Sequence, residues 1–247
     1  MRHSTRYRLN TFFSASNFPK GVKWLLISNT AVFVLDYLAH QAGFGEIFNL
    51  LALVPRAVIF HLAIWQLGTY LFVHGGVGHL LFNMLALWIF GATLERDWGT
   101  RRFLKYYFLC GVGAGVCDVA VNAVLGNWYT STIGASGAIY GVLLAFGMLY
   151  PEAIILFMFI FPIQAKYFVM IVGAMALLGS LNMNSGVSNV AHLGGMIFGL
   201  LYLKARFPTL DMYEVRRWYR NYKLQRAKKK FQVYMRKHGS DRGPWVN

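Results

Sequence analysis

Long apolar runs separated by short polar segments dominate this chain of 247 residues. A helix of about 20 predominantly apolar residues is long enough to cross the hydrocarbon core of a bilayer. The runs predict six such helices, at about 23–42, 77–95, 102–123, 136–150, 164–181 and 189–206. We therefore expect an all-α membrane protein whose compact part is a bundle of six transmembrane helices.

Two further apolar segments do not fit the pattern of a span. Residues 43–76 are interrupted by Pro55 and Arg56, and we interpret them as a loop that lies in the membrane interface and is partly embedded. Residues 153–163 are broken by Pro162, and we expect them to lead into the fifth helix. Neither segment is therefore counted among the six helices.

The charged residues are few and unevenly distributed. They make up 13% of the chain, about half of the fraction typical of a soluble domain, which supports a membrane protein. The net charge of +15 raises the alternative of nucleic-acid binding, but 13 of the 24 Lys and Arg residues lie between Lys204 and Arg242, after the last apolar run. A basic segment beside a span is typical of an orientation signal or a contact with anionic lipid, so we expect no nucleic-acid partner.

The same charges predict the domain organisation. We expect a cytosolic leader at 1–22, a six-helix domain at 23–207 and a basic cytosolic tail at 208–247. Aromatic residues recur among the basic residues of the tail, which favours an amphipathic helix on the anionic inner leaflet. A solvated tail that serves only the membrane topology is the alternative.

Lys and Arg residues also gather on one side of the predicted bundle, because successive loops alternate between having them and lacking them. They precede the first helix and follow the second at Arg96, Arg101 and Arg102, whereas the loops 124–135 and 182–188 have none. Cytoplasmic loops are enriched in Lys and Arg, so we expect both termini in the cytosol. We interpret the chain as a multi-pass protein of a bacterial inner membrane; a mitochondrial transit peptide in the basic leader is the alternative.

Polar residues stand near the starts of three predicted helices. In the expected orientation the second, fourth and sixth helices run inward, so His79 and Asn83, Ser136 and His192 come to a similar depth on the extracytoplasmic side. A serine hydroxyl becomes an effective nucleophile when a histidine takes its proton. Ser136 as nucleophile and His192 as base therefore predict hydrolysis of an amide inside the bilayer.

Attack on a carbonyl creates an oxyanion, which needs preorganised hydrogen-bond donors. The amides at the start of the fourth helix, near Gly134 and Ala135, are candidates because the first N–H groups of a helix have no intrahelical partner. His79 and Asn83 are four residues apart and so lie on one face of the second helix, where their side chains complete the predicted oxyanion site.

Other residues are expected to support this pair. Tyr140 follows Ser136 by four residues, which places its ring on the same face of the helix, where it can hold His192. Small residues at helical spacing would let the fourth and sixth helices approach closely enough for a direct Ser–His contact. These residues are Gly141, Gly195 and Gly199.

The fourth helix is short for a span. From Ser136 to Tyr150 it has 15 residues, about 22 Å of helix against a hydrocarbon core of about 30 Å. The polar loop 126–132 would therefore descend into the membrane, where irregular backbone is tolerated only against protein or trapped water. We expect a water-filled cavity, open outward, with Ser136 at its floor.

These motifs resemble those of the rhomboid family of intramembrane serine proteases, and the resemblance covers about 24–206. Three motifs carry it: Gly134 to Gly137 is similar to the family's Gly-x-Ser-Gly, His79 with Asn83 to its His-x-x-x-Asn, and Ala191, His192 and Gly195 to its Ala-His-x-x-Gly. His74 matches an additional upstream histidine of the family. One departure is that the family's Trp-Arg pair in the first loop reads Trp65-Gln66 here.

The resemblance implies a rhomboid-like six-helix fold and a Ser136–His192 dyad with no acid member. It also implies that no cofactor takes part and that the substrates are single-span membrane proteins, cut near their outer end. Two alternatives come from other classes of protein. A catalytically silent relative would bind membrane helices without cleaving them, and a small transporter would use the same polar cavity for a solute.

The remaining ionisable residues have plainer interpretations. A zinc site could draw on His74, His79 and His192, but no His-Glu-x-x-His helix and no neighbouring carboxylate accompany them, so we expect no metal. Asp118, in the third helix, is interpreted as a satisfied buried carboxyl or a residue that lines the cavity.

Overall fold

The structure is a computed structural model that describes residues 18–157, 160–181 and 188–206. The chain divides into two compact units, 1–202 and 203–247, and all of the residues discussed as a site belong to the first. The amphipathic helix predicted in the tail at 208–247 lies outside the described residues, as does most of the leader at 1–22.

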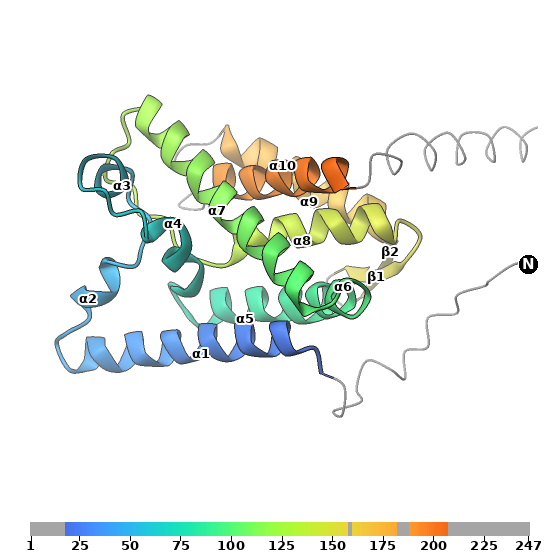
Figure 1. The fold of residues 1–247 in the computed structure, drawn as a ribbon, viewed down its shortest axis with the longest axis horizontal. Helices are drawn as coiled ribbons and strands as arrows, with labels where there is room; N and C mark the ends of the chain where they lie inside the picture. Colours follow the sequence, from blue (N-terminus) through green and yellow to red (C-terminus); the bar gives the residue numbers. More distant parts are fainter. Residues whose placement is uncertain (1–17, 158–159, 182–187, 207–247) are drawn as a thin grey trace, which may run out of the picture. The chain divides into compact units, whose positions relative to one another are not determined.

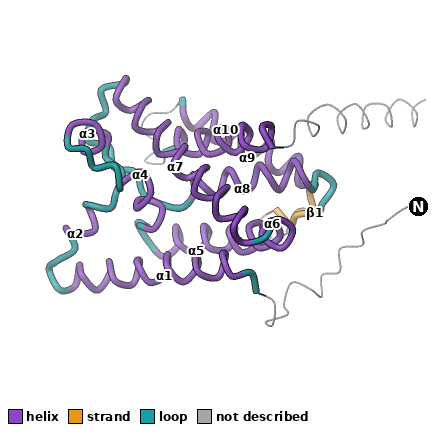
Figure 2. The backbone as a smooth tube through the Cα atoms, viewed as in Figure 1, coloured by secondary structure: helices purple, strands orange, loops and turns teal. Residues whose placement is uncertain are grey.

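Helices occupy the positions of all six apolar runs and form most of the described chain (Figures 1 and 2). The second of these helices, Val77–Trp98, is continuous and has a π-helical turn, η4 (Leu87–Gly91), at its middle. The main helices are α1 (Lys20–Gln41), α5 (Val77–Ala86) with α6 (Ala92–Trp98), α7 (Thr100–Val124), α8 (Ser136–Leu149), α9 (Ala165–Ser180) and α10 (Asn189–Arg206).

Three of the described helices are long and apolar enough to cross a membrane, namely α1, the combined helix Val77–Trp98 and α7. Two more, α8 and α9, are apolar but shorter. A chain with this many apolar helices is an integral membrane protein.

The long first loop folds into short helical turns: α2 (Glu46–Asn49), α3 (Pro55–Phe60), α4 (Gln66–Thr69) and η3 (Tyr70–Phe72). The buried side chain of Gln66 holds them together, because its amide oxygen accepts from the N–H of Val54 at 3.0 Å and its amide nitrogen donates to the carbonyl of Leu50 at 3.2 Å. The indole of Trp65 donates to the same carbonyl at 3.0 Å. Gln66 therefore serves the internal structure of the loop.

The segment 153–163 is a correction to the expected all-α fold. It forms an antiparallel hairpin of β1 (Ile154–Phe157) and β2 (Phe161–Gln164), in which Ile154 lies opposite Gln164. The run does lead directly into α9, as expected, but it does so as two strands. Pro162 has no N–H to donate within a helix, and β-branched residues such as Ile154 and Ile163 favour strands.

The buried carboxylate of Glu95 joins α1 to the turn between α6 and α7. It accepts from the N–H groups of Gly21 and Val22, both at 2.7 Å, and from the hydroxyl of Thr100 at 2.6 Å. The first amides of a helix have no intrahelical partner, so this side chain satisfies two of them at the start of α1.

Helix α8 is the centre of the first unit. It contacts α5, α6, α7 and α9, and Figure 1 shows it between α5 and α10. Most of its 14 residues are buried: Gly137, Ala138, Ile139, Gly141, Val142, Leu143, Ala145, Phe146 and Gly147. Ser136, its first residue, is therefore held by a helix that is packed on nearly every side.

Candidate active site

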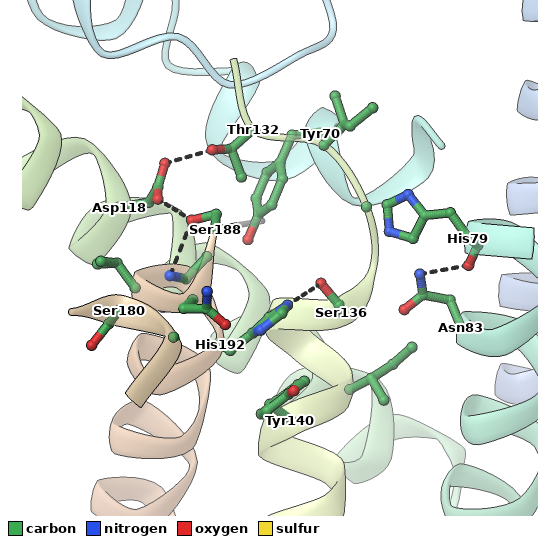
Figure 3. A pocket seen from close by; sticks show the side chains of 18 of the residues that line it. Tyr70, His79, Asn83, Asp118, Thr132, Ser136, Tyr140, Ser180, Ser188 and His192 are labelled. Carbon is green, nitrogen blue, oxygen red and sulfur yellow. Dashed lines mark hydrogen bonds between the residues drawn. The ribbon is translucent and has the colours of Figure 1, made fainter. Parts of the chain in front are cut away.

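The structure brings Ser136 and His192 into direct contact. Ser136 begins α8, His192 lies in the first turn of α10, and their side chains point toward one another (Figure 3). The hydroxyl oxygen of Ser136 lies 2.7 Å from Nε2 of His192. An unprotonated Nε2 accepts the hydroxyl proton, and this is the contact that a nucleophile and its general base require.

Close contact between α8 and α10 permits this distance. A Cβ added at Gly195 would collide with the carbonyl oxygen of Gly137, and a Cβ at Gly141 would lie 3.0 Å from the carbonyl oxygen of Gly195. A Cβ at Gly199 would lie 3.3 Å from Cα of Gly141. The three glycines predicted to let the helices approach therefore lie in the contact itself.

The imidazole of His192 is held on its face as well as at its edge. The ring of Tyr140 stacks on it with a centroid distance of 4.1 Å and an interplanar angle of 5°. Nδ1 of His192 is buried and has no hydrogen-bond partner within the described part of the chain. No described carboxylate therefore completes a triad with this histidine.

Gly134 shapes the loop that enters α8. Its φ of +112° lies in the region that favours glycine, and a Cβ added there would lie 2.6 Å from Nε2 of His79. Its N–H donates to the carbonyl of Tyr70 at 2.9 Å. This differs from the expectation that Gly134 offers a free amide, because the N–H is already engaged. Ala135, which caps α8, and Ser136 remain the backbone candidates.

His79 and Asn83 lie on the other side of Ser136 from His192 (Figure 3). The Asn83 amide nitrogen donates to the carbonyl of His79 at 2.9 Å, which fixes the orientation of this buried side chain. An asparagine amide carries two N–H donors, so one remains beyond this bond. The His79 ring and the Asn83 amide thus border the same space as the Ser136 hydroxyl.

His74 packs behind this pair, in the loop before α5. Its ring centroid lies 5.0 Å from that of His79, and its Nδ1 lies 3.3 Å from the carbonyl oxygen of Phe72. Burial, followed by the nearby His79 ring, lowers the pKa of His74 to about 4. His74 is therefore neutral at pH 7 and supports the position of His79.

A cavity of about 1040 Å³ includes both Ser136 and His192 in its wall. One part of the wall is polar, with side chains from the end of α7 and the loop that follows it. Another part is apolar and comes from Phe82 of α5 and from Phe168 and Val172 of α9. Residues of the polar part include Asp118, Asn122, Asn127, Thr130, Ser131 and Thr132.

The prediction that Asp118 is a satisfied buried carboxyl is confirmed. It accepts hydrogen bonds from the hydroxyls of Thr132 and Ser188. Sequence reasoning missed Ser188, although a serine directly before an apolar helix is a typical N-cap signal. Within residues 18–157, 160–181 and 188–206, no group of three His, Cys, Asp or Glu side chains is placed to hold a metal ion.

A serine in hydrogen-bond contact with a histidine, at the meeting point of apolar helices, makes this an integral membrane protein that carries the side-chain pair found in serine hydrolases. Residues 61–209 match the Rhomboid domain, and the chain belongs to the rhomboid family.

Three relatives illustrate the similarity. The chain is 31% identical over 175 residues to Rhomboid protease GlpG of Haemophilus influenzae, a match that spans 70% of this chain and 85% of that protein. It is 36% identical over 135 residues to Rhomboid protease GluP of Bacillus subtilis, across 55% of this chain and 24% of that protein. It is 34% identical over 138 residues to Rhomboid protein 1, mitochondrial, of Saccharomyces cerevisiae, across 53% and 38%. The chain thus spans less than half of the last two relatives.

Proposed function

We propose that this protein is an intramembrane serine endopeptidase with Ser136 as nucleophile and His192 as general base. The observation that carries the proposal is the 2.7 Å contact between the Ser136 hydroxyl and Nε2 of His192. Membership of the rhomboid family and similarity to proteins named as proteases support it.

In the proposed reaction, His192 takes the proton of Ser136 as its oxygen attacks the substrate carbonyl. His79, Asn83 and the first amides of α8 stabilise the oxyanion, each donor being worth about 3–4 kcal/mol. His192 then gives the proton to the leaving amine, which leaves an acyl ester on Ser136. Water activated by the same histidine hydrolyses that ester and restores the enzyme.

We propose a membrane arrangement of six spans with both termini in the cytosol, in a bacterial inner membrane. In this arrangement α5, α8 and α10 run inward, and the 14 residues of α8 make only about 21 Å of helix. Ser136 then lies below the outer surface, so a single-span substrate is cut near its extracytoplasmic end. We further propose that the basic tail binds anionic lipid.

The cavity wall suggests where the substrate enters. Its apolar part combines α5 and α9, and only Ala165, Val169 and Ala176 of α9 are buried. A helix held by so few contacts can yield to a substrate helix. The substrate must also unwind, because helical amides are protected by their own hydrogen bonds, so cleavage is expected at small or helix-breaking residues.

The test is cleavage of a model single-span protein in liposomes that contain the purified enzyme. Wild type should release two fragments, and Ser136→Ala and His192→Ala should lower the rate by at least about 10³-fold. Ser28→Ala is the matched control, because the Ser28 hydroxyl only donates to the carbonyl of Leu25 within α1. It should cleave like wild type.

Three results would contradict the proposal. Cleavage by Ser136→Ala at the wild-type rate would show that another group is the nucleophile. Binding of the substrate helix by wild type without turnover would favour a catalytically silent relative. Uptake of a solute without any proteolysis would favour a transporter.

A further inference from the structure

Asp118 occupies an unusual position for a carboxylate. It lies in α7, it is fully buried, and it is the only acidic side chain among the described residues that line the cavity. Oδ2 accepts from the hydroxyl of Thr132 at 2.9 Å, and Oδ1 accepts from the hydroxyl of Ser188 (Figure 3). A buried carboxylate forms strong hydrogen bonds with such donors, so the two hydroxyls are firmly held.

The first hydroxyl belongs to the loop that carries the nucleophile. Thr132 lies four residues before Ser136. Its backbone pairs with Leu53, since the N–H of each residue donates to the carbonyl of the other at 2.9 Å. Two residues later, Gly134 is bonded to Tyr70. The bond from Thr132 to Asp118 therefore anchors this loop to α7 directly before the turn into α8.

The second hydroxyl belongs to the start of the helix that carries the base. The oxygen of the Ser188 hydroxyl accepts from the N–H of Ala191 at 3.3 Å, and the Ser188 carbonyl accepts from the N–H of His192 at the same distance. Ser188 thus caps α10, and its hydroxyl is in turn fixed by Asp118. A shift of Ser188 would be passed directly to His192.

We propose that Asp118 is a positioning residue that keeps the Ser136 loop and the start of α10 in register. This inference rests on the proposed function, because the alignment that matters is that of the Ser136–His192 pair. Asp118 acts one step away from the pair: both of its oxygens are occupied by hydroxyls, and among the described residues Nδ1 of His192 has no partner.

The effect on catalysis follows from geometry. A displacement of about 1 Å between reacting groups lowers a rate by about 100-fold. Asp118→Ala frees both segments at once, so kcat should fall by about 10- to 100-fold. KM should stay within about twofold of wild type, because both carboxylate oxygens are bound to hydroxyls of the protein and not to substrate. Thr132→Val and Ser188→Ala each release one segment, and each should lower kcat by less than Asp118→Ala.

Glu95→Gln is the matched control. Glu95 is also a buried carboxylate that joins separate elements through both oxygens, but its partners are Gly21, Val22 and Thr100, none of which touches the pair. It should lower the midpoint of thermal unfolding while kcat, measured well below that midpoint, stays within about twofold of wild type. Asp118→Ala, measured at a temperature equally far below its own midpoint of thermal unfolding, should show a lowered kcat.

Two further measurements keep the test decisive. If Asp118→Ala does not fold, Asp118→Asn keeps the shape and one acceptor oxygen, and Ser188→Ala keeps the carboxylate. The double variant Asp118→Ala with Thr132→Val should be no worse than Asp118→Ala, because the Thr132 hydroxyl donates to Asp118 and both substitutions remove that same bond. Additive losses would overturn the proposal.

The outcomes separate the two claims. Wild-type cleavage together with an unchanged kcat in Asp118→Ala would overturn the positioning role and leave the protease proposal intact. A raised KM with unchanged kcat would overturn it too, since Asp118 would then bind substrate. No cleavage by wild type would remove the proposed function and the positioning role with it.

Discussion

Helices α8 and α9 are both short and apolar, but the protein holds them in opposite ways. Nine of the 14 residues of α8 are buried, whereas three of the 16 residues of α9 are. The face of α9 that is exposed in the first unit carries large apolar side chains, including Met170, Met175 and Leu178. The residue proposed to attack the substrate thus stands on the helix that is buried at most positions, whereas α9, past which the substrate is proposed to enter, is buried at few.

This difference has a physical basis. A reacting pair has to be aligned to within about 0.5 Å, and only side chains on well-packed elements keep that alignment. Entry of a substrate helix demands the reverse, a wall that can move without unfolding the rest. In the proposed function, α8 with α10 meets the first demand and α9 meets the second.

Replacing a glycine by alanine should have very different effects on stability and cleavage in α10 and in α9, and this is the largest contrast that we expect. Gly195→Ala places a Cβ against the carbonyl oxygen of Gly137, a backbone atom that cannot turn away. We expect a loss of about 2–3 kcal/mol in stability and about 100-fold in the rate of cleavage. At Gly173 of α9 the added Cβ would meet Cε of Met196 at 3.2 Å, the end of a flexible side chain.

Gly173→Ala should therefore be neutral or slightly stabilising, because alanine favours a helix over glycine by about 1 kcal/mol. Thermal unfolding in detergent and cleavage in liposomes measure both variants. Equal losses of stability and cleavage rate in Gly195→Ala and Gly173→Ala would contradict the idea that α9 is loosely held.

A pair of valines gives a smaller contrast. Val142 in α8 is 0% exposed and Val169 in α9 is 8% exposed. Val142→Ala leaves a cavity that the packed helices around α8 cannot close, so we expect a loss of about 2 kcal/mol. Val169→Ala should lose less than about 1 kcal/mol, because α9 can shift to fill the space. Chemical denaturation of both variants in the same detergent provides the measurement, and a larger loss for Val169→Ala would reverse the comparison.

The smallest effect is expected at Tyr140, through which α8 also holds the base. Its stacked contact with His192 is of the kind worth about 0.5–1.5 kcal/mol. Tyr140→Leu should lower kcat by about two- to tenfold, and Tyr140→Phe, which keeps the ring, should stay close to wild type. If the phenylalanine variant were as slow as the leucine variant, the hydroxyl and not the stacked ring would be the important group.

The helices were predictable from the sequence because their signal is local and repeated. Twenty apolar residues in a row indicate a span whatever surrounds them, so the bounds of α1, α7 and α10 agree with the prediction to within a few residues. The hairpin of β1 and β2 could not be predicted, because a short apolar run does not distinguish a strand from a helix.

The candidate site shows the same division. The meeting of Ser136, His192 and Tyr140 follows from helix direction and from a spacing of four residues, both of which can be read along the chain. The hydrogen bonds of Asp118 could not be predicted in this way, because they join residues that are 14 and 70 positions apart in the sequence. The engagement of the Gly134 amide by Tyr70 likewise depends on how the first loop packs, which no local pattern contains.

Covalent labelling of Ser136 tests the proposed Ser136–His192 dyad more directly than any substitution. The enzyme in liposomes is treated with a fluorophosphonate, and the adduct is located by mass spectrometry of its peptides. We expect one adduct, on Ser136, formed at least about 100-fold more slowly in His192→Ala because the base that activates the hydroxyl is gone. An adduct on another serine, or equal labelling of wild type and His192→Ala, would contradict the proposed dyad.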